Sequence, residues 1–213
     1  MATQTSSPVF DYKLLRLLVG IIAFALPITV SNLAAAPLPS ISASYYTNGR
    51  DIFIGMLFIV GSFLIAYNGH TIPQAVLSKI AGLAAILIAL YPTACTGCDE
   101  NLSSHIHSWS AVILFLILTY FCFWPFRKNT KRQKGKKGVR SKLYLICGYV
   151  MLICIIGMGI SRAVLSKDVL SSTEITYWGE AIALGAFGVA WIVAGKFIWF
   201  LVDEKEALRF RRK

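Results

Sequence analysis

The sequence predicts an all-α membrane protein, a six-transmembrane-helix bundle with both termini in the cytoplasm (N-in/C-in). The first observation is apolar content. The chain is 56% hydrophobic, and its apolar residues form six runs close to the roughly 20 residues that cross a bilayer. The second is a basic segment at residues 127–142, where nine of sixteen residues are Lys or Arg, between two of these runs. Because short Lys/Arg-rich loops stay on the cytoplasmic side, this segment orients the protein.

The expected spans alternate with short polar connections in a single polytopic membrane domain, residues 1–213. Of the 21 Lys and Arg residues, only Arg50, Arg162 and Lys167 fall outside, which agrees with the positive-inside rule. We therefore predict a multi-pass integral membrane protein. The spans are expected at about residues 14–36, 51–67, 75–91, 105–126, 143–162 and 177–202.

The net charge of +11 alone would be compatible with a nucleic-acid partner. The charge, however, is concentrated in the basic segment and the C-terminal tail, and is not spread over a soluble face. We therefore interpret it as an orientation signal with an attraction to anionic lipid, and expect no nucleic-acid partner. The basic segment itself is expected to hold no site.

The first span resembles a secretory signal in one respect. Lys13 and Arg16 precede an apolar run that ends in Ala-Ala-Ala-Pro, which resembles a small-residue cleavage site. Pro37 directly after Ala36 disfavours cleavage, and the run is long for a signal peptide. We expect a retained helix, kinked near Pro27.

Small residues recur at helical spacing in three expected spans. Such residues let membrane helices approach closely, so they predict packing faces, within one chain or in a homo-oligomer. The sixth span carries Gly179, Ala183, Ala186, Ala190 and Ala194, the third Ala81, Ala85 and Ala89, and the fifth Gly148, Gly157 and Gly159.

Ionisable and aromatic residues gather at the ends of the expected spans that lie opposite the basic segment. Ionisable groups at membrane depth are costly and usually face a cavity, a partner or the bundle interior. One interpretation is an ion-pair network that only pins helix ends. The other is a polar pocket for an amphiphile, with the ligand-binding candidates Arg50, Asp51, His107, Arg162, Glu180, Tyr46 and Trp178.

Cys95 and Cys98 lie between the third and fourth spans, on the predicted outer side, where thiols meet oxidising conditions. A disulfide between them is the simplest interpretation. A thioredoxin-like exchange pair, free thiols and a Cys2His2 metal site that adds His105 and His107 stay open. Residues two apart on a helix point to nearly opposite sides, so both histidines reach one ion only if the helix begins after them.

Several strings resemble a group of uncharacterised bacterial six-span integral membrane proteins. They are YYTNGRDIFIGMLFIVGSFLIAYNGH, AGLAAILIALYPT and YWGEAIALGAFGVAWIVAGK, with His107 and Ala111 between the last two. More distantly, a His opening the fourth span and a Glu beside a Trp in the last are similar to the Frag1/DRAM/Sfk1 type, linked to lipid, GPI-anchor and autophagy-related functions. This resemblance implies a place in the bacterial inner (cytoplasmic) membrane and functional roles for Arg50, Asp51, His107 and Glu180. It supplies no reaction.

From these features we expect a protein that binds or organises an amphiphilic, lipid-like ligand at the outer leaflet, without chemistry of its own. The alternative is a small intramembrane enzyme, lipid hydrolase-like, in which Asp51, His107 and Glu180 act as acid/base groups or metal ligands. A small-solute transporter is disfavoured by the lack of polar residues at mid-membrane. Membrane lipids are the expected partners, and no cofactor is expected.

Overall fold

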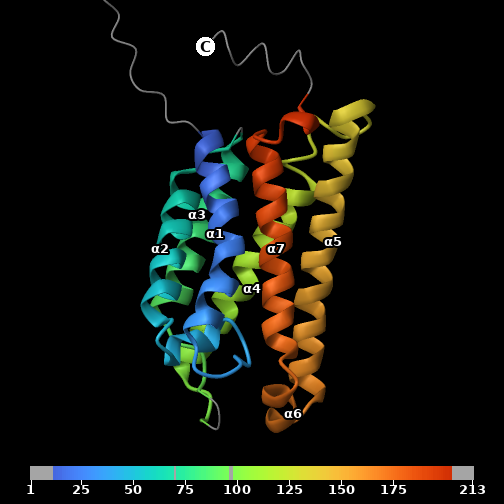
Figure 1. The fold of residues 1–213 in the computed structure, drawn as a ribbon. Helices are drawn as coiled ribbons and strands as arrows, with labels where there is room; N and C mark the ends of the chain where they lie inside the picture. Colours follow the sequence, from blue (N-terminus) through green and yellow to red (C-terminus); the bar gives the residue numbers. More distant parts are fainter. Residues whose placement is uncertain (1–11, 70, 96–97, 203–213) are drawn as a thin grey trace, which may run out of the picture.

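The computed structural model describes residues 12–69, 71–95 and 98–202, and within them every regular element is helical. Six long helices lie side by side along one axis (Figure 1). They are α1 (Tyr12–Leu33), α2 (Arg50–Ala66), α3 (Ile72–Leu90), α4 (Leu102–Phe123), α5 (Gly135–Val164) and α7 (Ile175–Gly195). The short elements are the 3-10 helix η1 (Ser42–Tyr46), α6 (Lys167–Ser172) and the 3-10 helix η2 (Trp199–Leu201).

Helices α1, α3, α4, α5 and α7 are each long and apolar enough to cross a membrane. Their outward faces carry large apolar side chains that would be unfavourable in water, for example Ile153 on α5, which is 67% exposed. The prediction of an all-α, multi-pass integral membrane protein is thereby confirmed. Helix α2 has 17 residues, fewer than those five.

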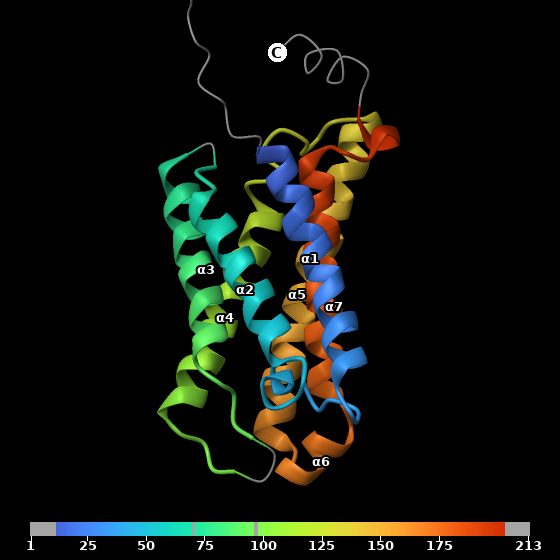
Figure 2. The ribbon, with the colours of Figure 1, turned by 60° about the vertical axis from the view of Figure 1, so that its left-hand side comes forward.

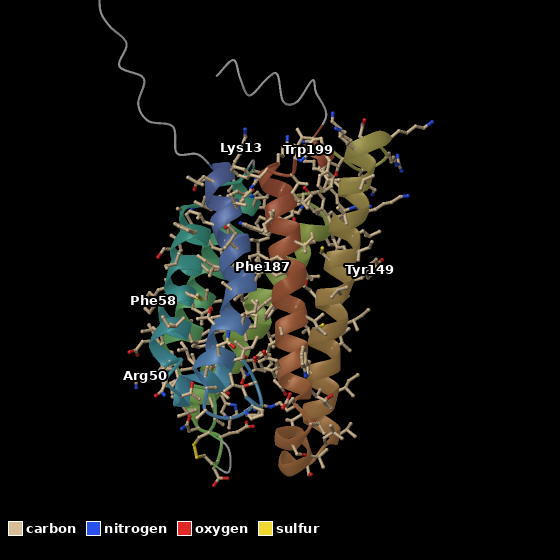
Figure 3. The ribbon with its side chains drawn as sticks, viewed as in Figure 1. Lys13, Arg50, Phe58, Tyr149, Phe187 and Trp199 are labelled. Carbon is tan, nitrogen blue, oxygen red and sulfur yellow. A yellow bond between two sulfur atoms is a disulfide. The ribbon has the colours of Figure 1, made fainter. Side chains whose placement is uncertain are left out.

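Both ends of the described chain lie at one end of the bundle. Lys13 and Trp199 mark this end in Figure 3, and Arg50 lies at the other. The basic segment 127–142 joins α4 to α5 at the same end as Lys13 (Figure 1). We call this the basic end, and the other, which carries η1 and α6, the polar end.

Two boundaries differ from those expected. The second half of the basic segment is helical, because α5 begins at Gly135 and continues for 30 residues to Val164. Charge excludes such residues from hydrocarbon but not from a helix that extends into water, so charge alone could not locate the helix start. Helix α7 ends at Gly195, where Lys196 adopts a left-handed conformation with φ 61°, and not near residue 202.

The predicted small-residue faces differ in whether they pack against other helices of the chain. Ala81, Ala85 and Ala89 on α3 are at most 1% exposed, and on α7 Ala183 and Ala190 are fully buried. These faces therefore pack inside the chain. On α5, a Cβ added at Gly157 or Gly159 would meet nothing within 4 Å, so their predicted packing role is wrong within this chain. Both glycines are exposed, in the half of α5 that leads to α6 (Figure 2).

Trp191 on α7 is fully buried at the centre of an aromatic cluster in the basic half. The rings of Phe126 and Phe187 lie 5.1 Å from it, and that of Tyr67, which ends α2, lies 5.8 Å away. Arg16 of α1 donates hydrogen bonds to the Ala194 carbonyl (2.8 Å) and the Tyr67 hydroxyl (2.6 Å). The cluster therefore joins α1, α2 and α7 to the turn after α4.

A close helix crossing brings Gly61 of α2 against Gly82 of α3. A Cβ at Gly61 would lie 2.8 Å from the Gly82 carbonyl oxygen, and a Cβ at Gly82 would lie 2.6 Å from that of Gly61. Backbone this close leaves no room for a methyl group.

We predict that Gly61→Ala destabilises the bundle by about 1–3 kcal/mol, because the added methyl group must push α2 and α3 apart. Gly55→Ala on the same helix is the matched control, since its Cβ would meet nothing within 4 Å. That control should be neutral or stabilised by up to about 1 kcal/mol of helix propensity. Thermal unfolding in detergent measures both, and equal midpoints would contradict the close crossing.

Candidate functional site

A groove of about 880 Å³ opens at the polar end of the bundle. One wall is the connection between α1 and α2, from Ala35 to Asn48. The other contains residues 93–95, Cys98, Glu100 and the α5–α6–α7 corner, with Arg162, Leu165 and Leu170. Apolar side chains such as Leu38 and Leu165 line it together with polar groups. We call it the polar-end groove.

Its charged group is an ion pair between Arg162, in the last turn of α5, and Glu100. The Arg162 guanidinium donates to the Glu100 carboxylate, and both side chains are partly exposed. The ring of His105 lies 3.7 Å from the same carboxylate. Asn101 caps α4 by accepting a hydrogen bond from the Ser104 amide (3.0 Å), so that Glu100 stands just outside the helix.

Tyr46 closes another side of the groove. Its hydroxyl donates a hydrogen bond of 2.6 Å to the Thr93 carbonyl and thereby ties η1 to the connection between α3 and α4. Partial burial, with a smaller contribution from Tyr45, raises the pKa of Tyr46, and the protonated hydroxyl is the donor of this hydrogen bond. Asn48, nearby on the same rim, is exposed.

Glu180 lies at the same end but binds backbone. Its Oε2 accepts hydrogen bonds from the amides of Ile41 (2.6 Å) and Ser42 (3.2 Å), and Oε1 accepts one from the Ser42 hydroxyl (3.2 Å). The Tyr177 amide donates to the Pro39 carbonyl (3.1 Å), so α7 holds the α1–α2 connection at two points. Glu180 supports the groove wall from behind and does not line the groove.

His107 is 3% exposed, and its Nδ1 is 2.7 Å from the Tyr91 carbonyl oxygen. Tyr91 is the C-cap of α3, and the chain after it is not helical, so no helical amide reaches its carbonyl. The histidine therefore satisfies a carbonyl that α3 leaves without a helical donor. This role belongs to the end of α3 and not to the groove.

The remaining candidates lie on the outside. Asp51 is 87% exposed at its side chain and pairs with its neighbour Arg50, at 3.2 Å. Arg50 also lies 6.0 Å from the ring of Tyr45. Trp178 is 57% exposed and contacts Tyr177, with ring centroids 5.3 Å apart. Of the seven predicted ligand-binding residues, the groove lining contains Tyr46 and Arg162.

Cys95 and Cys98 form a disulfide on the groove rim. His107 faces the end of α3 and His105 faces Glu100, so the structure does not assemble the predicted Cys2His2 set. Among the described residues no three His, Cys, Asp or Glu side chains are grouped as metal ligands.

The residues that sequence reasoning missed are Glu100, Asn48, Leu165 and Leu170. Glu100 had one visible signal, since it follows Cys98 closely on the predicted outer side. Its pairing with Arg162 depends on how α4 and α5 are placed, which no local pattern shows. Leu165 and Leu170 carry no signal that separates them from other apolar residues.

We predict that Glu180→Ala lowers the stability of the bundle by about 3 kcal/mol, since it leaves the amides of Ile41 and Ser42 without their side-chain acceptor. Glu180→Gln keeps an acceptor oxygen and should cost about 1 kcal/mol. Asp51→Asn is the control, because an exposed carboxylate should change stability by less than about 0.5 kcal/mol. Thermal unfolding in detergent ranks the stabilities of the three variants. A wild-type midpoint for Glu180→Ala would contradict a stabilising contact between Glu180 and the α1–α2 connection.

Comparison with known proteins gives one family. No curated protein and no solved structure matches the chain. Residues 25–175 match DUF998, described as a protein of unknown function. This region runs from within α1 to the start of α7 and includes every residue that lines the polar-end groove except Thr176. The chain belongs to the DUF998 family, an uncharacterised family of which this member is a multi-pass helical membrane protein.

Proposed function

We propose that this protein binds an amphiphilic, lipid-like ligand in the polar-end groove and carries out no chemistry of its own. The observation that carries the proposal is the make-up of the groove. It combines the Glu100–Arg162 pair with apolar walls that include Leu38, Leu165 and Leu170, in a volume suited to a small amphiphile. A head group would contact the charges, and an acyl chain would follow the apolar wall.

We also propose six spans, with both termini in the cytoplasm and the groove at the outer leaflet of a bacterial inner membrane. Helix α2 would be the sixth span. Its 17 residues extend about 26 Å, close to the hydrocarbon thickness. Its outward side chains are apolar, including Ile52, Ile59 and Ile65, and Phe58 is labelled on that side in Figure 3. Basic residues at the opposite end support this orientation.

The hydrolase alternative has less support. It requires Asp51, His107 and Glu180 to act together. Asp51 instead pairs with Arg50 at the surface, His107 bonds the end of α3, and Glu180 bonds the α1–α2 connection. The similarity to the Frag1/DRAM/Sfk1 type and the homo-oligomer stay predictions.

A groove-filling variant tests the ligand. Ala43 is half-buried and lines the groove, so Ala43→Trp should occupy the space that the ligand needs. We expect co-purified amphiphile, measured by lipid mass spectrometry, to fall at least about tenfold, the effect of losing roughly 1.4 kcal/mol of binding.

Val169→Trp is the matched control, because Val169 is 42% exposed and lies outside the groove lining. It should retain the wild-type amount of ligand. Metal analysis of the same samples separates the alternatives. Bound metal would favour the hydrolase, and wild-type protein without any amphiphile would overturn the proposal.

Orientation can be tested by labelling single introduced cysteines in intact cells with a membrane-impermeant maleimide. Ser172→Cys at the polar end should react in intact cells, whereas Lys134→Cys at the basic end should react only after lysis. Both positions are exposed in the structure, so access depends on the side of the membrane alone. The reverse pattern would place the groove in the inner leaflet and refute the proposed topology.

A further inference from the structure

A second cleft, of about 590 Å³, lies at the basic end, far along the bundle from the polar-end groove. The start of α3, the end of α4, the turn after α4 and the outward side of α5 form it. We call it the basic cleft. It faces outward between helices, where a bound lipid could enter from the bilayer. Neither the family match nor the proposed function assigns anything to it.

The mouth of the basic cleft is strongly positive. Arg127, Lys128 and Lys131 line it, and its described lining contains no Asp or Glu. The Arg127 Nε donates to the Ser141 hydroxyl at 3.2 Å, which holds this guanidinium between the turn and α5. Lys128 and Lys131 are exposed and available to a ligand. The start of α3 adds the positive end of a helix dipole.

The wall of the cleft is aromatic. Trp124 is 62% exposed and stacks on Tyr120, with ring centroids 5.3 Å apart. Phe123 contacts Tyr149 edge-on at 5.1 Å, and a Cβ at Gly148 would lie 2.7 Å from the Phe123 ring. That glycine therefore lets the Phe123 ring approach α5 closely. Tyr149 lies along α5 away from the basic end (Figure 3), so the apolar wall continues toward the membrane interior.

We propose that the basic cleft binds an anionic phospholipid. Its phosphate would contact Arg127, Lys128 and Lys131, and an acyl chain would lie along the aromatic wall. The cations lie at the end of the bundle and the aromatic rings lie deeper. A lipid in the adjacent leaflet has the same order, with its head group outermost and its acyl chains deeper. A soluble anion would use the cations and leave the aromatic wall bare. The exposed indole of Trp124 next to the cations is therefore better explained by a lipid.

The basic segment offers its own control for diffuse charge attraction. Arg132 and Lys134 belong to the same segment and are exposed, but they do not line the cleft. Replacing them removes the same charge from the same surface. If the lipid binds in the cleft, loss of Lys128 and Lys131 should weaken binding more than loss of Arg132 and Lys134. If it is attracted only by surface potential, the two losses should be equal.

The test compares binding of phosphatidylglycerol with binding of phosphatidylcholine of the same chain length, by native mass spectrometry of the full-length protein in detergent. Wild-type protein should prefer phosphatidylglycerol. The cleft variant Lys128→Gln/Lys131→Gln should lose about 30-fold in affinity for it. The control Arg132→Gln/Lys134→Gln should lose less than about threefold, because its charges lie outside the site.

Equal losses in the two double variants would overturn the proposal in favour of diffuse attraction, and so would equal binding of the two lipids by wild-type protein. Displacement of phosphatidylglycerol by millimolar inorganic phosphate would reassign the cleft to a free anion. Unchanged thermal midpoints show that the variants are folded, and the single variant Lys128→Glu should weaken binding on its own. Ala43→Trp in the polar-end groove should leave this binding intact.

Discussion

The buried contact around Trp191 is the one on which both ends of the molecule depend. In lipid, apolar surface alone drives little association, so a bundle needs shape-specific packing. Trp191 supplies it by touching aromatic rings from the end of α2, from α4 and from the turn after α4. Arg16 completes the contact from α1, because its guanidinium satisfies the Ala194 carbonyl at the end of α7 and lies 5.1 Å from the ring of Tyr67.

From this contact the two clefts follow. Phe126 packs on Trp191 and directly precedes Arg127, so the same packing that orders the turn also places the mouth of the basic cleft. At the other end, α7 carries Glu180, whose carboxylate holds the α1–α2 connection. Irregular backbone at membrane depth is tolerated only where its polar groups are satisfied, and Glu180, His107 and Tyr46 satisfy them here. Helix α7 is thus the common support of both ends.

Sequence patterns predicted the helices well and the site only in part. Apolar runs locate membrane helices because hydrocarbon excludes polar backbone and side chains, and that constraint acts locally. The start of α5 was missed because the exclusion of polar groups does not act on a part of a helix that lies outside the hydrocarbon. Glu180 and His107 were predicted to bind a ligand, but a carboxylate or imidazole can be satisfied by main chain as well as by a ligand. Their partners, Ile41 and Tyr91, are set by tertiary structure.

The unequal lengths of α2 and α5 have a consequence for the surrounding bilayer. As the proposed sixth span, α2 offers about 26 Å of helix, whereas α5 without its eight residues in the basic segment has 22 residues and extends about 33 Å. The two lie on different sides of the bundle (Figure 1). The bilayer beside α2 must therefore become thinner, or the bundle must tilt, whereas beside α5 the bilayer can be thicker. Each ångström of mismatch costs only a fraction of a kcal/mol, yet such differences sort proteins among membranes of different thickness. The protein would then carry a thickness gradient around its circumference.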